Sequence, residues 1–451
     1  MTDTATLVAW DRQHLWHPFT QMSEWLRDDP IVITAAEGCT LIDATGRRYL
    51  DGVSSLWCNV HGHRHPRIDA AIRAQLERVA HTTMLGLASV PAVELAHALL
   101  QVVPPGLTRV FYSDAGATAV EAALRIALQY QHMRGAVGRT RFASLVEGYH
   151  GDTLGAVGVG YSETFHRHIA GGIVAAVRLP PPHVFRWEHG MTPAAACEAA
   201  IAAATRLLAE HGASLAAIIV EPLVQGAAGM WVHPVEYLHA LHDLARRHDT
   251  LLIADEVATG FGRTGRFFAC EHAGITPDIV CVAKGISGGY LPLAATLTTE
   301  AVFDAFLAPY DAFQAFFHGH TYTGNPLACA AGVASLALFH EEQTLDHVAT
   351  MTARLQERLQ RDVNPLAHVG DIRQLGVMVG IELVRERTTR TGYAPTERIG
   401  HRIILAARRR GVMIRPLGNV VVLMPPLAMS LAEIDQLVDA VRAAIVEVTE
   451  A

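Results

Sequence analysis

The chain contains one lysine, Lys284, among its 36 lysine and arginine residues. This bias indicates that arginine serves wherever a generic positive charge suffices, and that position 284 needs an amine. Arginine is effectively never deprotonated, whereas a desolvated lysine can act as a nucleophile and form an imine with a carbonyl compound. Composition alone leaves one alternative open, that a single surface lysine has survived by chance.

The neighbours of Lys284 argue against that alternative. Lys284 follows the apolar run Ile279–Ala283 and precedes the glycine-rich segment Gly285–Gly289. The run predicts a buried strand, and the carboxyl ends of such strands are where α/β sheets place their ligands. Burial also disfavours the ammonium form of lysine. The sequence therefore predicts a reactive amine at a ligand site.

Two carboxylates, Asp255 and Glu256, end another apolar run, Leu251–Ala254. Successive strand side chains point to opposite faces, so only one of the two can face the same pocket as Lys284. A pyridoxal ring needs an acid at its pyridine nitrogen, because the protonated ring is the electron sink that stabilises a carbanion. We assign Asp255 to that position and Glu256 to packing or an ion pair. Taken alone, the motif also fits two acids that cap a strand.

A segment of small residues, Ser113–Ala119, lies between a predicted strand and the helix predicted at Val120–Met133. Backbone N–H groups at such a helix N-terminus are open to a phosphate. The segment is weak as a lone signal, since small residues are common at helix starts for capping alone. Together with Lys284 and Asp255 it predicts a site for pyridoxal 5′-phosphate.

Two further patterns suggest other sites, and we reject both. Gly260–Gly265 matches GxGxxG after a strand, but the residues that follow do not start a helix, so the dinucleotide-binding context fails. His61–His65 and His318–His320 resemble metal sites but lack partner ligands at standard spacing. No metal is expected, and these histidines are interpreted as loop or pocket residues.

Composition limits the possible classes. The 451 residues are 50% hydrophobic and 18% charged, with a net charge of −8. Nucleic acid and anionic membrane are therefore not expected partners, and a small-molecule substrate is expected instead. No signal peptide or apolar stretch long enough to cross a membrane is found, so the expected location is cytoplasmic. The six cysteines show no CxxC spacing and are predicted to be reduced thiols.

The order of predicted elements gives an α/β fold with a mainly parallel sheet wrapped by helices, because strands alternate with helices through the middle of the chain. This large domain is expected at 65–330, with 1–64 and 331–451 forming a small α+β domain from both chain ends. The predicted strands of the large domain are 108–113, 215–220, 251–257 and 278–283, and its helices include 120–133, 192–208 and 237–247. The small domain is predicted to contain a hairpin at 31–50, strands at 371–383 and 412–423, and helices at 344–363, 395–410 and 430–449.

Lys284, Asp255, Ser113–Ala119 and His318–Pro326, in their relative order, resemble class III, fold-type I pyridoxal-phosphate aminotransferases over nearly the whole chain. The resemblance implies a large cofactor-binding domain, with Lys284 as the imine-forming lysine and Asp255 as the partner of the ring nitrogen.

Other residues take roles only through this resemblance. Gly116 and Ala117 would present backbone amides to the phosphate, and Tyr149 would stack on the ring. His320 and Thr321 would reach the phosphate bound by the neighbouring subunit, which implies a homodimer with shared active sites.

More narrowly, four segments resemble one biosynthetic subgroup of this family, whose members aminate a keto acid. They are Leu15–Met22, Ser54–Trp57, Gly148–Thr153 and Arg415–Gly418. The resemblance implies that Arg415 pairs with the distal carboxylate of the substrate, which a planar guanidinium matches bidentately. The implied substrate-binding residues are Phe19, Leu56, Trp57, Tyr149, Gly319 and Arg415.

Three positions depart from the members that use S-adenosylmethionine as amino donor. Those members have tyrosine at Phe19, tryptophan at Leu56 and proline at His320. The sequence instead resembles a subgroup with His-Gly-His and the segment Gly370–Gly376, in which lysine can be the donor. Both donors stay open, as does another class III ω-aminotransferase acting on a diamine or ω-amino acid. An aminomutase or decarboxylase on the same scaffold and a non-enzymatic vitamin-binding protein are more remote alternatives.

Overall fold

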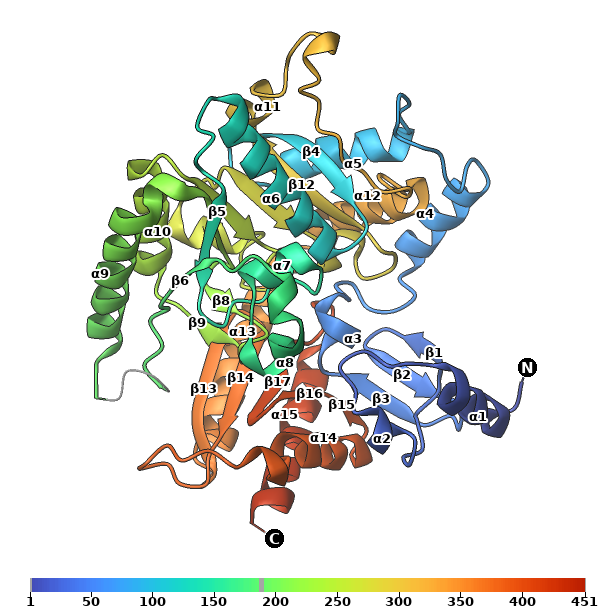
Figure 1. The fold of residues 1–451 in the computed structure, drawn as a ribbon. Coiled ribbons are helices and arrows are strands. Elements are labelled where there is room, and N and C mark those ends of the chain that lie inside the picture. The colour runs from blue at the N-terminus through green and yellow to red at the C-terminus, as the bar shows by residue number, and fades with distance from the viewer. Residues whose placement is uncertain (1, 186–189, 451) are drawn as a thin grey trace.

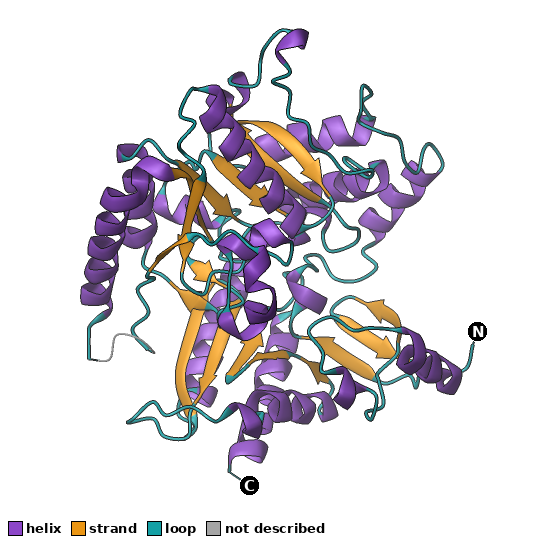
Figure 2. Ribbon diagram, in the orientation of Figure 1, coloured by secondary structure: helices purple, strands orange, loops and turns teal. Residues whose placement is uncertain are grey.

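The computed structural model describes residues 2–185 and 190–450. A large sheet wrapped by helices occupies the upper part of the view in Figure 1, and two smaller sheets lie below it, as the colouring by secondary structure in Figure 2 makes plain. The N-terminal segment that contains β1, β2 and β3 (residues 33–51) and the C-terminal segment that contains β13–β17 (residues 369–423) lie side by side in this lower part. Within the described ranges, no helix is both long enough and apolar enough to cross a membrane.

The large sheet has seven strands and is mostly parallel, which confirms the predicted fold class. Only β12 runs antiparallel to its neighbours β11 and β4. The strands in spatial order are β4 (Leu107–Ser113), β12 (Ala294–Thr299), β11 (Ile279–Val282), β10 (Leu251–Asp255), β7 (Leu215–Val220), β5 (Arg141–Leu145) and β6 (Val177–Leu179).

The two faces of this sheet are covered by different helices. Leu251 and Ile253 of β10 belong to a core that includes α6 (Gly116–Met133), whereas Leu252 and Ala254 belong to the core on the opposite face. That opposite core includes α5 (Val90–Leu100), α10 (Val235–Arg247) and α12 (Pro326–Glu341). The alternation puts consecutive side chains at the end of β10 on opposite faces.

One of the two smaller sheets joins segments that are far apart in the chain, and the other is built from the C-terminal part alone. One contains β1 (Ile33–Glu37), β2 (Thr40–Asp43), β3 (Arg48–Asp51) and β15 (Val412–Met413). The other contains β13 (Val369–Leu375), β14 (Met378–Leu383), β17 (Val420–Leu423) and β16 (Arg415–Leu417). Because β15 pairs with β3, both chain ends share a sheet. The domain boundaries at residues 64 and 330 stay predictions.

Three expectations for these sheets were wrong. Each of the single strands predicted at 371–383 and 412–423 is broken by a tight turn, at Gly376 and Gly418, and both glycines have a φ of +59°. A Cβ on Gly376 would lie 2.3 Å from the carbonyl oxygen of Arg263, so only glycine fits there. The hairpin at 31–50 is a three-stranded meander. Apolar residues flank both Gly376 and Gly418, so periodicity alone did not reveal these two turns.

The helix predicted at 344–363 consists of α13 (Thr344–Arg358) and a π-helical turn, η6 (Leu359–Val363). The predicted terminal helices correspond to α14 (Ile399–Arg409) and α15 (Leu431–Thr449). The other helices are α1 (Thr4–His14), α2 (Met22–Trp25), α3 (Ser54–Trp57), α4 (Pro66–Leu76), α7 (Leu154–Val159), α8 (Glu163–His166), α9 (Pro193–His211) and α11 (Glu300–Asp304), and a short hairpin is formed by β8 (Val224–Gln225) and β9 (Trp231–Val232).

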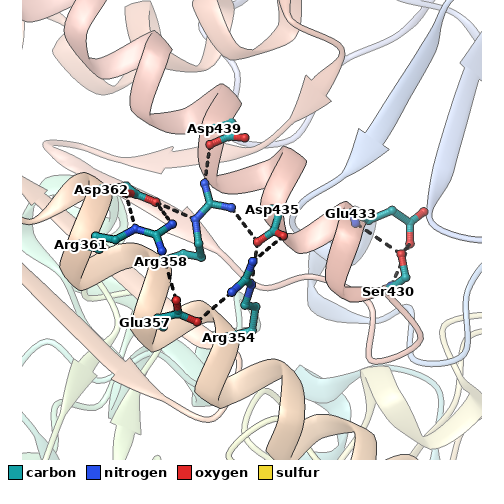
Figure 3. A network of polar contacts seen from close by, with 9 residues as sticks. All are labelled: Arg354, Glu357, Arg358, Arg361, Asp362, Ser430, Glu433, Asp435 and Asp439. Carbon is teal, nitrogen blue, oxygen red and sulfur yellow. Dashed lines mark hydrogen bonds and ion pairs between the residues drawn. The ribbon is translucent and has the colours of Figure 1, made fainter.

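An ionic network joins α13 and η6 to α15 (Figure 3). Its centre is Arg358, whose side chain is 8% exposed and contacts three carboxylates. The guanidinium lies 2.6 Å from Asp362, 2.6 Å from Asp435 and within hydrogen-bonding distance of Asp439. Because Asp435 and Asp439 belong to α15, one buried cation fixes the packing of the two helices.

Removing that cation is expected to destabilise the fold. In Arg358→Ala, three carboxylates lose a shared partner, and we expect a loss of about 2 kcal/mol in the free energy of unfolding. In the matched variant Arg361→Ala, a side chain that is 56% exposed is lost from the same network, and we expect less than about 1 kcal/mol. Urea denaturation of both variants measures the difference. Equal losses would contradict a central role for Arg358.

Candidate active site

A cavity of about 700 Å³ lies where five strands of the large sheet end. Strands β5, β7, β10 and β11 are parallel, and β4 runs with them because it is antiparallel to β12. Their carboxyl ends therefore meet at one edge of the sheet, where this fold class binds ligands. The lining residues that follow these strands are 114–117, 149–153, 221, 255, 257–258 and 283–284.

Lys284 reaches this cavity immediately after β11. Its side chain is partly accessible because it lines the cavity, but the surrounding protein lowers the pKa of its amine from the usual 10.5. The negative charges of Asp255 and Glu221 oppose that effect. The Nζ atom lies 5.5 Å from the centre of the Trp57 ring. Desolvation thus favours the neutral, nucleophilic amine at this position.

Asp255 ends β10 and is 4% exposed, and it lines the cavity with Lys284. Its Oδ2 lies 2.7 Å from Nδ1 of His150, and its Oδ1 accepts a hydrogen bond from the backbone N–H of Val257. A carboxylate can only accept, so His150 donates through Nδ1 when Asp255 is ionised. The two contacts hold one carboxylate in a fixed orientation within reach of the cavity.

Glu256, the next residue, is not among the residues that line the cavity. It is buried, and its carboxylate accepts hydrogen bonds from the backbone N–H groups of Ala269 at 3.0 Å and Cys270 at 2.8 Å, and from the hydroxyl of Thr259. Glu256 therefore provides hydrogen-bond acceptors for the backbone N–H groups of the turn at Ala269 and Cys270. The carboxylates of Asp255 and Glu256 therefore have different surroundings, because the two side chains point to opposite faces of the sheet.

The first turn of α6 forms another side of the cavity. Gly116 and Ala117 are the first two helical residues, and N–H groups at such positions have no partner within the helix. A Cβ on Gly116 would lie 2.7 Å from Val257, and one on Gly151 would lie 2.4 Å from Cβ of Ala117. The missing side chains let the helix start approach its neighbours closely. This arrangement suits a phosphate.

Two aromatic residues, Tyr149 and Trp57, complete the cavity walls. Burial raises the pKa of the Tyr149 phenol, and the hydrogen bond of 2.7 Å that its hydroxyl donates to Asp152 raises it further. Trp57 has a left-handed backbone with a φ of +63°. Taken together, Lys284, Asp255 and the α6 N-terminus could hold a cofactor that carries an aldehyde, a ring nitrogen and a phosphate.

The remaining predicted site residues do not line this cavity within one chain. Phe19 is 68% exposed and its ring lies edge-on to Phe165, and the side chain of Leu56 is also exposed. Arg415 is exposed at the start of β16. His320 lies beside His318, which stacks on Phe111, and Gly319 and Thr321 belong to the same loop. The roles of these residues stay predictions.

The cavity residues that sequence reasoning missed include His150, Glu221 and Cys58. Glu221 directly follows the apolar strand Leu215–Val220, just as Asp255 ends its own strand, so the same pattern could have identified it. His150 lies inside the motif quoted for Tyr149. Cys58 follows Trp57 and, unlike the other cysteines, is not buried.

Comparison with known proteins agrees with this geometry. The model of the family described as aminotransferase class-III matches residues 22–445. An adenosylmethionine-8-amino-7-oxononanoate aminotransferase of Nitratidesulfovibrio vulgaris is 56% identical over 99% of this chain and 83% of its own length. A protein of the same name from Geobacter sulfurreducens is 49% identical over 99% of both chains.

Solved structures agree as well. The crystal structure of the adenosylmethionine-8-amino-7-oxononanoate aminotransferase of Methanocaldococcus jannaschii has a TM-score of 0.93 at 40% identity and covers 99% of this chain and 100% of that one. A thermostable (S)-enantioselective omega-transaminase from Thermomicrobium roseum has a TM-score of 0.95 at 34% identity and covers 99% of both chains.

The fold and the cavity are those of an α/β aminotransferase, and the chain belongs to the class-III aminotransferase family. Within that family, three relatives that are 49 to 56% identical to this chain and are matched over 83 to 99% of their own lengths share one name.

Proposed function

We propose that this chain is a pyridoxal-phosphate-dependent aminotransferase that converts 8-amino-7-oxononanoate to 7,8-diaminononanoate in biotin biosynthesis, with the cytoplasm as its expected location. The observation that carries the chemistry is the convergence of Lys284, Asp255 and the α6 N-terminus on one cavity. The 56% sequence identity to a relative named for this acceptor supports the substrate.

The residues present fit the cofactor. Lys284 offers an amine to its aldehyde, Asp255 an acid to its pyridine nitrogen, and Gly116 and Ala117 backbone N–H groups to its phosphate. When bound, pyridoxal phosphate supplies an electron sink that stabilises negative charge on a substrate carbon. The closely fitted glycines at 116 and 151 leave the helix start open on the cavity side, which supports this assignment.

The residues of this chain would then divide the remaining tasks. Lys284 would move a proton to and from the reacting carbon, because burial lowers the pKa of its amine and favours the neutral form that can accept a proton. Asp255, oriented by His150, keeps a proton on the ring nitrogen. Tyr149 and Trp57 shield the reacting face from water.

The names of the relatives favour S-adenosylmethionine as amino donor, whereas Phe19, Leu56 and His320 leave lysine open. We expect S-adenosylmethionine to change the visible absorbance of the cofactor-loaded protein in a single turnover, and lysine to leave it unchanged at the same concentration. Adding 8-amino-7-oxononanoate should then restore the absorbance and release 7,8-diaminononanoate, detected by mass spectrometry. If lysine changed the visible absorbance and S-adenosylmethionine did not, lysine would be the amino donor.

A second candidate is another class III ω-aminotransferase, which the structural similarity to the Thermomicrobium roseum enzyme favours. Steady-state kcat/KM for 8-amino-7-oxononanoate, compared with simple aldehydes under the same donor, separates the two. Higher kcat/KM for the aldehydes would support the second candidate.

A homodimer with shared active sites is part of this proposal. His320 and Thr321 lie outside the chain's own cavity, as expected if they serve a neighbour. Large apolar side chains such as Leu85, Leu307, Tyr310 and Phe313 are exposed, and Tyr310 is 93% exposed. If these side chains gather in one patch, a second copy of the chain would cover them. Sedimentation at twice the mass of the chain is expected, and a monomer would contradict it.

A further inference from the structure

Glu221 is a buried cavity residue to which the proposed chemistry gives no task. It follows β7 directly and lines the same cavity as Lys284 and Asp255. Its Oε1 accepts a hydrogen bond of 3.0 Å from the backbone N–H of Tyr149, and its Oε2 accepts one of 2.8 Å from the backbone N–H of Gly226. Both carboxylate oxygens are thus held by the peptide backbone.

These two hydrogen bonds connect segments next to two walls of the cavity, the Tyr149 wall and the Trp57 wall. One holds the peptide that carries Tyr149. The other holds Gly226, which packs so closely that a Cβ there would lie 3.3 Å from the ring of Trp57. A single carboxylate therefore fixes the spacing between the two aromatic walls.

The loops that Glu221 connects are strained. Glu147, two residues before Tyr149, has a φ of +59°, and Leu223, in the loop that leads to Gly226, has a φ of +63°. Residues other than glycine rarely adopt this conformation, and it persists only where the surrounding structure enforces it. The Glu221 carboxylate is well placed to enforce both, because it holds each loop by a backbone N–H.

Glu221 also belongs to a cluster of charges around Lys284. The charged or titratable groups that face Lys284 are Asp255, Glu221, Cys58 and Arg263, and those that face Glu221 include His150 and Asp255. Burial raises the pKa of Glu221 to about 7, which the charge of His150 and the two N–H donors oppose. The negative charge of Glu221 favours the ammonium form of Lys284, against the effect of burial.

We propose that Glu221 is a positioning residue of this active site, which ties the Tyr149 wall to the Trp57 wall and sets the protonation of Lys284 by a second negative charge. The inference rests on the proposed function only in taking Lys284 as the reacting amine. When Glu221 is protonated, its hydroxyl oxygen is a weaker acceptor than a carboxylate oxygen, so one of the two N–H groups is held less firmly. The geometry of the walls and the state of Lys284 should therefore change together near neutral pH.

Because the chain has a single lysine, the protonation of Lys284 can be measured by chemical labelling, without an activity assay. The full-length protein, without added cofactor, is treated with formaldehyde and cyanoborohydride over a range of pH, and methylation of the peptide that contains Lys284 is measured by mass spectrometry. In Glu221→Gln we expect the midpoint of labelling to move about one pH unit lower, and labelling below both midpoints to be about tenfold faster.

A matched control is available in Glu256→Gln, because Glu256 is also buried and also accepts hydrogen bonds from two backbone N–H groups. We expect its midpoint to equal that of the wild type. A second variant, Gly226→Ala, keeps the Glu221 charge but pushes on the Trp57 ring. In the cofactor-loaded enzyme it should raise KM severalfold, with the Lys284 midpoint unchanged.

An unchanged midpoint in folded Glu221→Gln would overturn the inference. Should that variant fail to fold, Glu221→Asp takes its place, because it retains the charge but cannot reach both N–H groups. A wild-type labelling midpoint together with a raised KM in Glu221→Asp would support the inference. A wild-type KM in this variant would contradict it. If the midpoint shifts but wild-type protein does not aminate 8-amino-7-oxononanoate, only the proposed substrate fails. If turnover is normal and no midpoint shifts, only the role of Glu221 fails.

Discussion

Replacing Lys284 with arginine is expected to lower kcat for amination of 8-amino-7-oxononanoate by at least about 10⁴-fold. The substitution keeps the positive charge and most of the side-chain volume, but a guanidinium cannot act as the amine nucleophile or accept a proton at neutral pH. It also makes the chain free of lysine, so it is the direct test of why one lysine remains among 36 basic residues.

Turnover and covalent attachment measure this effect separately. Borohydride reduction of the loaded wild-type protein should add the mass of the cofactor to the peptide that contains Lys284, and no such addition is expected in Lys284→Arg. Thermal unfolding of both proteins checks that the variant is folded. Retained visible absorbance of the cofactor together with full turnover in Lys284→Arg would show that the site is misassigned.

The second large effect is expected in Asp255→Asn, with kcat lowered by about 10²- to 10³-fold and KM changed little. The amide of asparagine cannot hold a proton on a pyridine nitrogen by its charge, so the electron sink is weakened only in the transition state. The substitution also removes the negative charge that lies 2.7 Å from His150. Steady-state kinetics at saturating donor measures the change in kcat.

Glu256→Gln is the matched control for this prediction, because the two acids are adjacent in sequence but face opposite sides of β10. We expect it to lose stability, since its carboxylate accepts three hydrogen bonds from buried groups, and to retain near-normal kcat. Equal loss of kcat in both variants would mean that the two carboxylates are not separated by face as the structure indicates.

Much of the fold follows from local patterns. The strand at Leu215–Val220 was predicted with its observed bounds, and the strands before Asp255 and Lys284 were predicted within two residues, because a buried strand is a short, continuous apolar run. The hairpins at Gly376 and Gly418 were missed, since apolar residues lie on both sides of each turn.

By itself, the sequence determined the reactive groups of this protein: one amine, an acid at a strand end and a helix start of small residues, together with a mostly parallel sheet. Only the tertiary structure decided that Glu221 and His150 line the same cavity as Lys284 and Asp255. Residue chemistry and burial patterns are local properties of the chain. The convergence of these residues on one cavity depends on strand order and register between segments that are up to about 170 residues apart, from 113 to 284. No local pattern in the sequence encodes that order.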